Sequence, residues 1–214
     1  MTIYRVLIIN KTGGLIFNYD HNINSQEVEK TFSYPLYLRL KDQKDAVVVE
    51  YGQKDGIHVG QVIVAINGKK VNGSELANST SILAYLADEA NYPLSIKFAW
   101  PKLSTNEKVV LSSLFYAVFQ MSVQLSPEEH SSGIETIEME GFKLQCFQTL
   151  TGVKFIVMSD PKQNGLEAFL RKMYELYADY VLKNPFYTLD MPIKCEMFDQ
   201  NLLTQIDILE KNVP

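Results

Sequence analysis

The chain begins with two apolar segments that cannot form a stable structure by themselves. Ile3–Asn10 and Leu15–Asp20 are joined by Lys11-Thr-Gly-Gly. Paired glycines adopt positive φ at little cost, so this pattern predicts a β-hairpin. A two-stranded hairpin alone is at best marginally stable in water. The two strands must therefore complete a sheet with strands that come later in the chain.

The strands that can complete this sheet lie in the C-terminal half. Three apolar segments separated by glycine-containing turns are the candidates: Ile134–Glu140, Phe142–Gln148 and Val153–Ser159. The sequence between the hairpin and these strands has a different pattern, because short predicted strands and tight turns follow one another closely. We therefore predict a domain made of residues 1–24 plus 103–214, interrupted by a small β-rich insertion at residues 25–102.

The insertion is predicted to contain five short strands and one helix. Asn67-Gly68 is a tight-turn signal, and Ser79–Ala87 has apolar residues at helical spacing behind Ser and Thr caps. His21–Lys30 is interpreted as a polar connection. The clearest strand candidates are Leu36–Leu40, Ala46–Tyr51, Gln61–Ile66 and Leu94–Trp100.

A long helix is predicted to follow the insertion. Ser104-Thr-Asn-Glu107 is a capping box, and Ser126-Pro127 ends the helix near Leu125. At 100° per residue, its apolar side chains surround nearly the whole circumference, whereas a helix that covers one sheet face needs only a stripe. We therefore expect burial on two sides, one of them supplied by a neighbouring subunit.

The candidate contact residues for that subunit are the apolar positions of this helix, Val110, Leu111, Leu114, Phe115, Val118 and Phe119. The sequence does not distinguish which of them face inward. In the alternative interpretation, the insertion or the C-terminal helices cover the second side within one chain.

A second long helix carries one apolar stripe between Leu166 and Tyr180. It is predicted to end at Lys183-Asn184-Pro185, because proline disfavours helical geometry in the preceding residue. Asn184-Pro-Phe-Tyr187 has the form of an NPxY sorting signal, and we interpret it as a structural stop. Asn201–Leu209 is predicted to form a short final helix.

No catalytic, cofactor or metal site is predicted. The histidines His21, His58 and His130 lie far apart in loop-like surroundings, and the two cysteines lack metal-ligand spacing. Nothing assembles a nucleophile, a base and an anion-binding site. The net charge of −5 gives no cationic surface for nucleic acid. The apolar stretch Val109–Met121 is shorter than the roughly 20 residues that span a bilayer.

The order strand, strand, helix, three strands, two helices resembles the longin domain of membrane-traffic proteins. The resemblance implies an α/β (α+β) fold, the SNARE-like five-stranded antiparallel sheet with helices on both sides. The run KNPFYTLDMPIKCEMFDQNL resembles the C-terminal segment of longin-type subunits of the transport protein particle (TRAPP) tethering complex. The matching residues are Lys183, Asn184, Pro185, Phe186, Tyr187, Met191, Pro192, Ile193, Phe198 and Asp199.

The insertion narrows the resemblance to the synbindin type of these subunits, through NKTGGLIF, EKTFSYPL, VAINGKKVNG, NYPLSIKF, SSGIE and QTLTGVKF. The insertion itself looks PDZ-like, since Gly60–Val71 follows that family's strand, its Asn67-Gly68 turn and its valine. Gln61 stands where PDZ domains usually carry Asp, and no GLGF-type loop precedes Gly60. Backbone donors for a peptide carboxylate are therefore not recognisable.

The resemblance implies a cytoplasmic core subunit of a TRAPP-type tethering complex, peripheral on cis-Golgi and endoplasmic reticulum membranes through that complex. The TRAPP core is a guanine-nucleotide exchange factor for a Rab-type GTPase in ER-to-Golgi transport, and its longin subunits form part of the platform for the GTPase. The expected partners are the GTPase and other small subunits, both longin-type and larger α/β subunits, without nucleic acid or a membrane span.

Other functions remain as alternatives. A peptide-binding adaptor would use a groove between residues 54–62 and the Ser79 helix to hold a peptide ligand. Longin-containing SNAREs carry heptad repeats and a membrane anchor after the longin domain, and this chain ends at Pro214 with neither. An independent enzyme is the weakest alternative.

Overall fold

The computed structural model describes residues 2–21, 27–43, 46–52, 56–76, 81–128, 131–139 and 141–211. The chain divides into two compact units. We call Met1–Asn22 with Leu103–Pro214 the host unit, and Ile23–Lys102 the insertion unit. Predicted features at Lys54, Ser79, His130 and Glu140 lie outside the described residues.

The host unit is built on a five-stranded antiparallel sheet. Its spatial order is β2-β1-β11-β10-β9, so the first strand pairs with the last. The prediction that the N-terminal hairpin joins the three later strands is therefore confirmed. The strands are β1 (Ile3–Ile9), β2 (Leu15–Asp20), β9 (Thr136–Glu138), β10 (Lys143–Gln148) and β11 (Lys154–Ser159).

The turn between β1 and β2 is closed by a single side chain. Asn10 Oδ1 accepts hydrogen bonds from the backbone N–H of Thr12 at 3.1 Å and of Gly14 at 2.7 Å. Gly13 between them has φ +91°, and a Cβ placed on it would lie 2.9 Å from the Tyr116 ring. Only glycine fits both the positive φ and the close approach.

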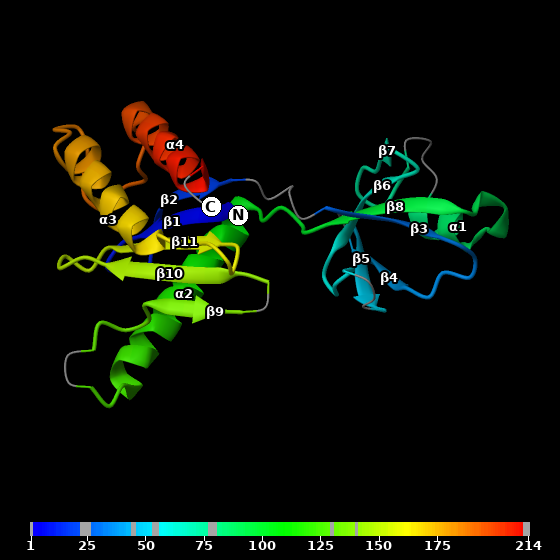
Figure 1. Cartoon of the computed structure of the whole chain (residues 1–214), viewed down its shortest axis with the longest axis horizontal. Helices are drawn as coiled ribbons and strands as arrows, with labels where there is room; N and C mark the ends of the chain where they lie inside the picture. The colour runs from blue at the N-terminus through cyan, green and yellow to red at the C-terminus, as the bar shows by residue number, and fades with distance from the viewer. Residues whose placement is uncertain are drawn as a thin grey trace. The chain divides into compact units, whose positions relative to one another are not determined.

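Helices cover both faces of the sheet (Figure 1). Helix α3 (Leu166–Leu176), a π-helical continuation η3 (Tyr177–Leu182) and α4 (Glu196–Lys211) lie on one face. Helix α2 (Thr105–Leu125) lies on the other. Alternate residues of the interior strand β1 separate the two cores, because Val6 and Ile8 point towards α3 and α4 while Leu7 and Ile9 point towards α2.

Two features of the C-terminal helices differ from the sequence expectation. Helix α4 begins at Glu196, five residues before the predicted Asn201. The carboxylates of Glu196 and Asp199 favour the first turn because they complement the helix dipole, and Phe198 begins the buried stripe. The π-helical turn at Tyr177–Leu182 gives no distinct signal in the apolar pattern.

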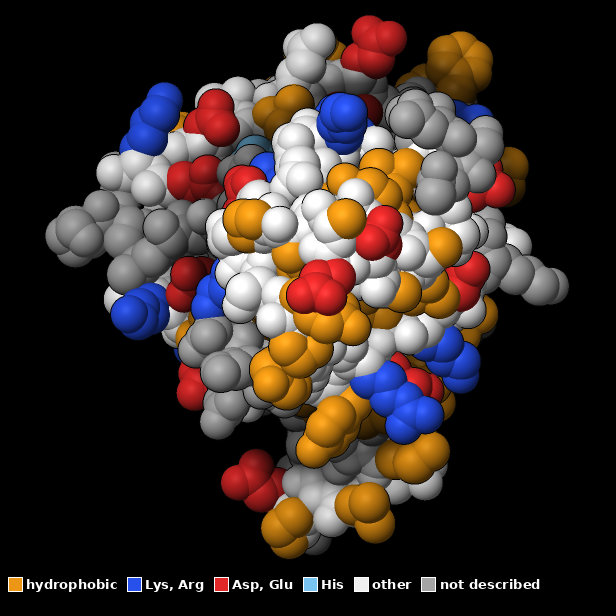
Figure 2. All heavy atoms as spheres, turned by 90° about the vertical axis from the view of Figure 1, so that its right-hand side faces the viewer, with side chains coloured by type: hydrophobic (Ala, Val, Ile, Leu, Met, Phe, Trp, Pro, Cys, Tyr) orange, Lys and Arg blue, Asp and Glu red, His pale blue; other side chains and the backbone are white. Residues whose placement is uncertain are grey.

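The insertion unit has its own sheet, with strand order β3-β8-β6-β5-β4 and β7 paired to β6. Its core contains ten fully buried apolar residues from the strands, helix α1 and the Ile57 region. Apolar, acidic and basic side chains are interspersed on the surface drawn in Figure 2. The elements are β3 (Val28–Phe32), β4 (Arg39–Gln43), β5 (Ala46–Tyr51), β6 (Val62–Ile66), β7 (Lys69–Lys70), α1 (Ile82–Ala87), η2 (Glu89–Asn91) and β8 (Leu94–Ala99).

The predicted Asn67-Gly68 turn joins β6 to β7, with φ values of +49° and +76° that match a type I′ hairpin. Two predictions for this unit are wrong. Strand β3 begins inside the stretch His21–Lys30 that is interpreted as a polar connection, and it ends two residues beyond that stretch. Its exposed residues alternate with half-buried ones, so only one side of the strand faces the core. Strand β4 begins at Arg39, since Leu36 and Leu38 pack on the core from a loop instead of pairing in the sheet.

Candidate subunit interface

Helix α2 is fixed firmly at its first turn. The predicted capping box is present: the Ser104 backbone N–H donates to Glu107 Oε2 at 2.7 Å, and the Glu107 N–H donates to Ser104 Oγ at 3.3 Å. These hydrogen bonds to Ser104 hold the pKa of the Glu107 carboxyl below its usual value. The helix therefore starts at a defined residue directly after the insertion.

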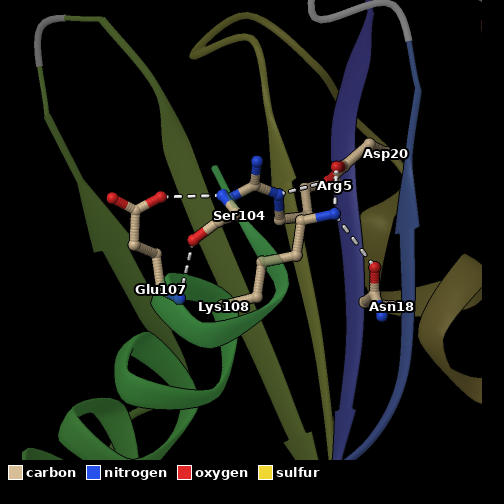
Figure 3. Close-up of polar contacts among 6 residues, drawn as sticks. All are labelled: Arg5, Asn18, Asp20, Ser104, Glu107 and Lys108. Atoms are coloured by element: carbon tan, nitrogen blue, oxygen red, sulfur yellow. Dashed lines mark hydrogen bonds and ion pairs between the residues drawn. The ribbon is translucent and has the colours of Figure 1, made fainter. Parts of the chain in front are cut away.

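A charged cluster ties this first turn to the sheet (Figure 3). Asp20 accepts from Arg5 Nε at 2.5 Å and lies 2.5 Å from Lys108 Nζ, which also donates to Asn18 at 3.1 Å. Burial opposes ionisation of Asp20, but the hydrogen bonds from Lys108 and Arg5 outweigh it and lower the pKa of its carboxyl. Asp20 ends the last strand before the insertion, so the cluster joins the two ends of the host unit where the insertion leaves and returns.

The inner face of α2 packs on the sheet. Leu111, Phe115, Phe119 and Val123 recur every four residues, the spacing of one helical face. Phe119 is 1% exposed and contacts the cluster formed with Leu7, Ile9, Cys146 and Ile156. Thus a single helix, with one fully buried aromatic, closes this side of the core.

A buried lysine lies beneath the same face. Lys154 is fully buried, and its Nζ lies 4.9 Å from the Tyr116 ring centroid and 4.8 Å from that of Phe119. It donates to the Gly152 carbonyl at 3.2 Å. Burial lowers the pKa of Lys154, and burial raises the pKa of the neighbouring Cys146 thiol to about 12. Aromatic faces partly replace the water that this ammonium group has lost.

The outer face of α2 is apolar and exposed. Leu114 is 60% exposed, and five other large apolar side chains of this helix are exposed as well. Most of them follow a spacing of three or four residues from Val110, which forms one continuous stripe. We call this stripe the outer face: Val110, Leu114, Val118, Met121 and Leu125.

Helix α2 is also longer than the sheet that it covers. Its 21 residues extend about 31 Å at 1.5 Å per residue. The strands of six or seven residues beneath it span only about 20–24 Å. In the second half of α2, Gly133 packs directly against the Phe119 ring, since a Cβ placed on Gly133 would lie 2.5 Å from that ring. The last turn to Leu125 therefore projects past the sheet.

By length and composition, α2 is apolar enough to cross a membrane. The expectation that its apolar stretch is too short considered only Val109–Met121. In the host unit, however, the inner face of α2 packs on the sheet and Lys108 forms an ion pair with Asp20. Entry of α2 into a bilayer would break both sets of contacts, so α2 is an element of the host core in this structure.

The six predicted contact residues separate into three groups. Val110, Leu114 and Val118 are exposed on the outer face. Leu111 and Phe115 are half-buried on the inner face. Phe119 points into the sheet and is not accessible. Met121 and Leu125 belong to the same stripe and were not among the candidates, although continuing the spacing from Val110 finds both.

The family-motif residues do not lie on α2 but form the loop from Lys183 to Cys195 and the start of α4. Phe198 is fully buried, and the backbone N–H of Ile193 donates to the Ile16 carbonyl at 2.8 Å. This hydrogen bond satisfies part of the outer edge of β2. Asp199 has a raised pKa because of burial and the neighbouring Glu196. Lys183, Pro185 and Pro192 are exposed.

The described residues contain no group of three or more His, Cys, Asp and Glu side chains that could hold a metal. Of the histidines, His21 approaches Glu210 at 3.5 Å and His58 stacks on Trp100. Neither lies on the outer face of α2. The arrangement offers a surface for binding, and we identify no reacting group on it.

A model of the Sybindin-like family matches residues 3–209. The chain is 53% identical to trafficking protein particle complex subunit 4 of Mus musculus over 211 residues, which is 99% of this chain and 96% of that protein. Subunit 4 of Dictyostelium discoideum is 44% identical over 141 residues, 65% of this chain and 98% of that protein. Subunit 1 of the same organism is 28% identical over 113 residues, 51% of this chain and 77% of that protein.

Proposed function

Because this chain belongs to the Sybindin-like family, we propose that it is a structural subunit of a trafficking complex of the TRAPP type. Its relatives are named as subunits 4 and 1 of the trafficking protein particle complex. Together with the fold, this supports a role in assembly.

The outer face of α2 binds another small subunit of the complex. One observation carries this proposal: a helix that is fixed at its first turn presents a continuous apolar stripe away from its own sheet. Large exposed apolar patches mark interaction surfaces. Helices α3 and α4 cannot cover the stripe, because they lie on the opposite face of the host sheet.

Through this assembly, the chain contributes to the platform on which a Rab-type GTPase exchanges its nucleotide during ER-to-Golgi transport. It supplies surface and position, without an active site of its own. Its location is cytoplasmic, and the complex holds it peripherally on cis-Golgi and endoplasmic reticulum membranes. The resemblance to longin-type TRAPP subunits supports these statements.

The test is native mass spectrometry of the tagged full-length chain isolated from cells. Leu114→Asp places an unpaired charge in the proposed contact and is expected to remove one or more small subunits from the complex. Leu150→Asp is the matched control, because Leu150 is fully exposed on the turn between β10 and β11. An unchanged set of subunits in a folded Leu114→Asp variant would contradict the proposal.

A PDZ-like insertion that captures an extended peptide is the second candidate. Strand β4 is an outer strand of the insertion sheet, so its free edge can accept an added strand. The groove expected between residues 54–62 and the Ser79 helix includes residues outside the described part of the chain, and at its described end Val62 pairs with Val48 and Ala99. Titration of the full-length chain with carboxyl-terminal peptides tests this role, and Lys41→Pro should abolish any binding at the β4 edge.

A further inference from the structure

A second apolar surface lies on the side of the host sheet away from α2. Four large apolar side chains are exposed in the segment that runs from the last residue of the π-helical turn towards α4, and Phe186 is 93% exposed. We call them the loop patch: Leu182, Phe186, Leu189 and Met191.

The loop patch is held in place by its own hydrogen bonds. Asn184 Oδ1 accepts from the Phe186 N–H at 3.0 Å, and the Tyr187 hydroxyl donates to the Met191 carbonyl at 3.0 Å. The Met191 N–H donates to the Thr188 carbonyl at 3.2 Å. The side chains of Tyr187 and Ile193 pack on the main core of the host unit. Phe186 is thus presented to solvent from an ordered loop, which reduces the entropy cost of binding.

The charged residues that neighbour the loop patch in the sequence are mainly acidic. Asp179 and Lys183 neutralise each other in an ion pair at 2.6 Å. Of the other charged residues from 190 to 199, Asp190, Glu196 and Asp199 are acidic and only Lys194 is basic. Among the described residues, none of these four forms an ion pair. The segment that carries the exposed Phe186 therefore has a net negative charge.

This net negative charge favours one kind of occupant. An anionic membrane surface would repel the acidic residues, and a second copy of this chain would bring two acidic surfaces together. A partner protein with an apolar pocket and surrounding Lys or Arg residues is complementary in both respects.

We propose that the loop patch is a second protein-binding surface, whose partner inserts Phe186 into an apolar pocket surrounded by basic residues. The partner differs from the subunit on α2, because the two surfaces lie on opposite faces of the host sheet. The chain is then a bridge between two proteins. The family motif from Lys183 to Ile193 both closes the edge of β2 and presents this surface.

Site-specific photo-crosslinking in the intact cellular complex tests the proposal. Benzoylphenylalanine replaces Phe186, Leu114 or Leu150 in the full-length chain, and the cross-linked peptides are identified by mass spectrometry. We expect position 186 to cross-link to a peptide that contains Lys or Arg beside apolar residues, in a protein different from that reached from position 114. Position 150 serves as the background.

The charge requirement is tested in the same experiment. Asp190→Lys combined with Glu196→Lys should lower the yield at position 186 at least about tenfold and leave the yield at position 114 unchanged. Circular dichroism and a thermal melt confirm that the variant is folded. Loss of the position 186 cross-link together with an intact position 114 cross-link separates this proposal from the proposed function.

Three outcomes would overturn the proposal: a yield at position 186 no higher than at position 150, cross-links to a second copy of this chain, or cross-links to the protein reached from position 114. Membrane binding is measured separately by sedimentation with vesicles of phosphatidylcholine and phosphatidylserine. If Phe186→Asp abolishes sedimentation with these vesicles, the surface is a lipid contact and the inference is wrong.

Discussion

The two long helices of the host unit differ in what covers them. Helix α3 has one apolar stripe, and all of that stripe is buried against the sheet and α4. Its opposite side carries ion pairs at 2.7 Å, from Arg171 to Glu167 and from Lys172 to Glu175. Helix α2 carries no charged residue from Val109 to Leu125. The side of α3 that faces water carries charged residues, whereas α2 carries apolar residues both on the side that packs on the sheet and on the exposed side.

Burial in the unit decides what a residue contributes to stability, and the exposed apolar side of α2 is the surface that we propose for assembly. Phe119 and Leu114 are both large and apolar on the same helix, yet one is buried and the other is exposed. If the comparison is correct, changes on the inner face of α2 alter folding and changes on its outer face alter binding alone.

The largest expected effect is on the inner face. Phe119→Ala removes a fully buried ring and leaves a cavity under Gly133 and above Lys154. The free energy of unfolding should fall by about 3–5 kcal/mol, as measured by urea denaturation of the full-length chain. Met173→Ala on α3 should cost about 2–5 kcal/mol. A loss below 1 kcal/mol for Phe119→Ala would mean that α2 is not part of the host core.

Removing the charged contact at the start of α2 should have a smaller effect. Asp20→Asn removes the carboxylate that binds Arg5 and Lys108. The free energy of unfolding should fall by roughly 1–2 kcal/mol at neutral pH, which is less than for a fully buried ion pair because Asp20 is partly exposed.

The effect of Asp20→Asn should depend on pH. The folded-state pKa of Asp20 is lowered, so its stabilisation is complete above the unfolded-state pKa of about 4 and is lost as pH falls through the folded value. The difference between wild type and Asp20→Asn in urea denaturation should therefore shrink below about pH 4. A difference that grows on acidification would show that the ion pairs do not stabilise the folded state.

Ser104→Ala should cost about 0.5–1 kcal/mol, because the capping box is exposed and a cap of this kind typically contributes that amount. Thermal denaturation followed by circular dichroism is sufficient to detect it. Ser126→Ala at the other end of α2 is the control. Among the described residues, the Ser126 hydroxyl accepts from the Glu128 N–H, outside the helix, so the change should be nearly neutral.

The smallest effect on folding is expected for the outer face. Leu114→Gln should change the free energy of unfolding by less than about 0.5 kcal/mol, because surface substitutions away from special contacts are nearly neutral. A loss as large as that of Phe119→Ala in urea denaturation would show that the stripe is covered within the chain, and the comparison between α2 and α3 would fail.

The pattern of apolar residues predicted most elements but not the orientation of α2. The hairpin, the capping box and the stripe of α3 follow from local chemistry. Helix α2 is apolar nearly all round, so no stripe marks its inner side. The polar residue Ser112 is in fact fully buried, and its hydroxyl donates to the Val109 carbonyl at 2.8 Å. Small size, which permits a close approach to the sheet, decides this position.

Strand β3 and the loop patch escaped the sequence interpretation for related reasons. The Val-Glu-Lys-Thr-Phe alternation of β3 resembles a polar linker until its pairing with β8 is known. Within the motif from Lys183 to Ile193, whose Asn184–Tyr187 part is interpreted as a structural stop, Phe186 and Met191 are exposed. Local sequence does not distinguish a buried loop aromatic from an exposed one, because the surrounding fold determines its exposure.

The pairing of β1 with β11 has a consequence during protein synthesis. The ribosome releases the N-terminal hairpin first, but its partner strand follows only after the complete insertion and α2. At roughly 5–20 residues per second, the hairpin waits on the order of ten seconds for β11. The insertion can fold during this interval, while the edge of β1 that pairs with β11 has no partner until β11 is synthesised. Codon usage across the insertion should therefore influence the yield of native protein.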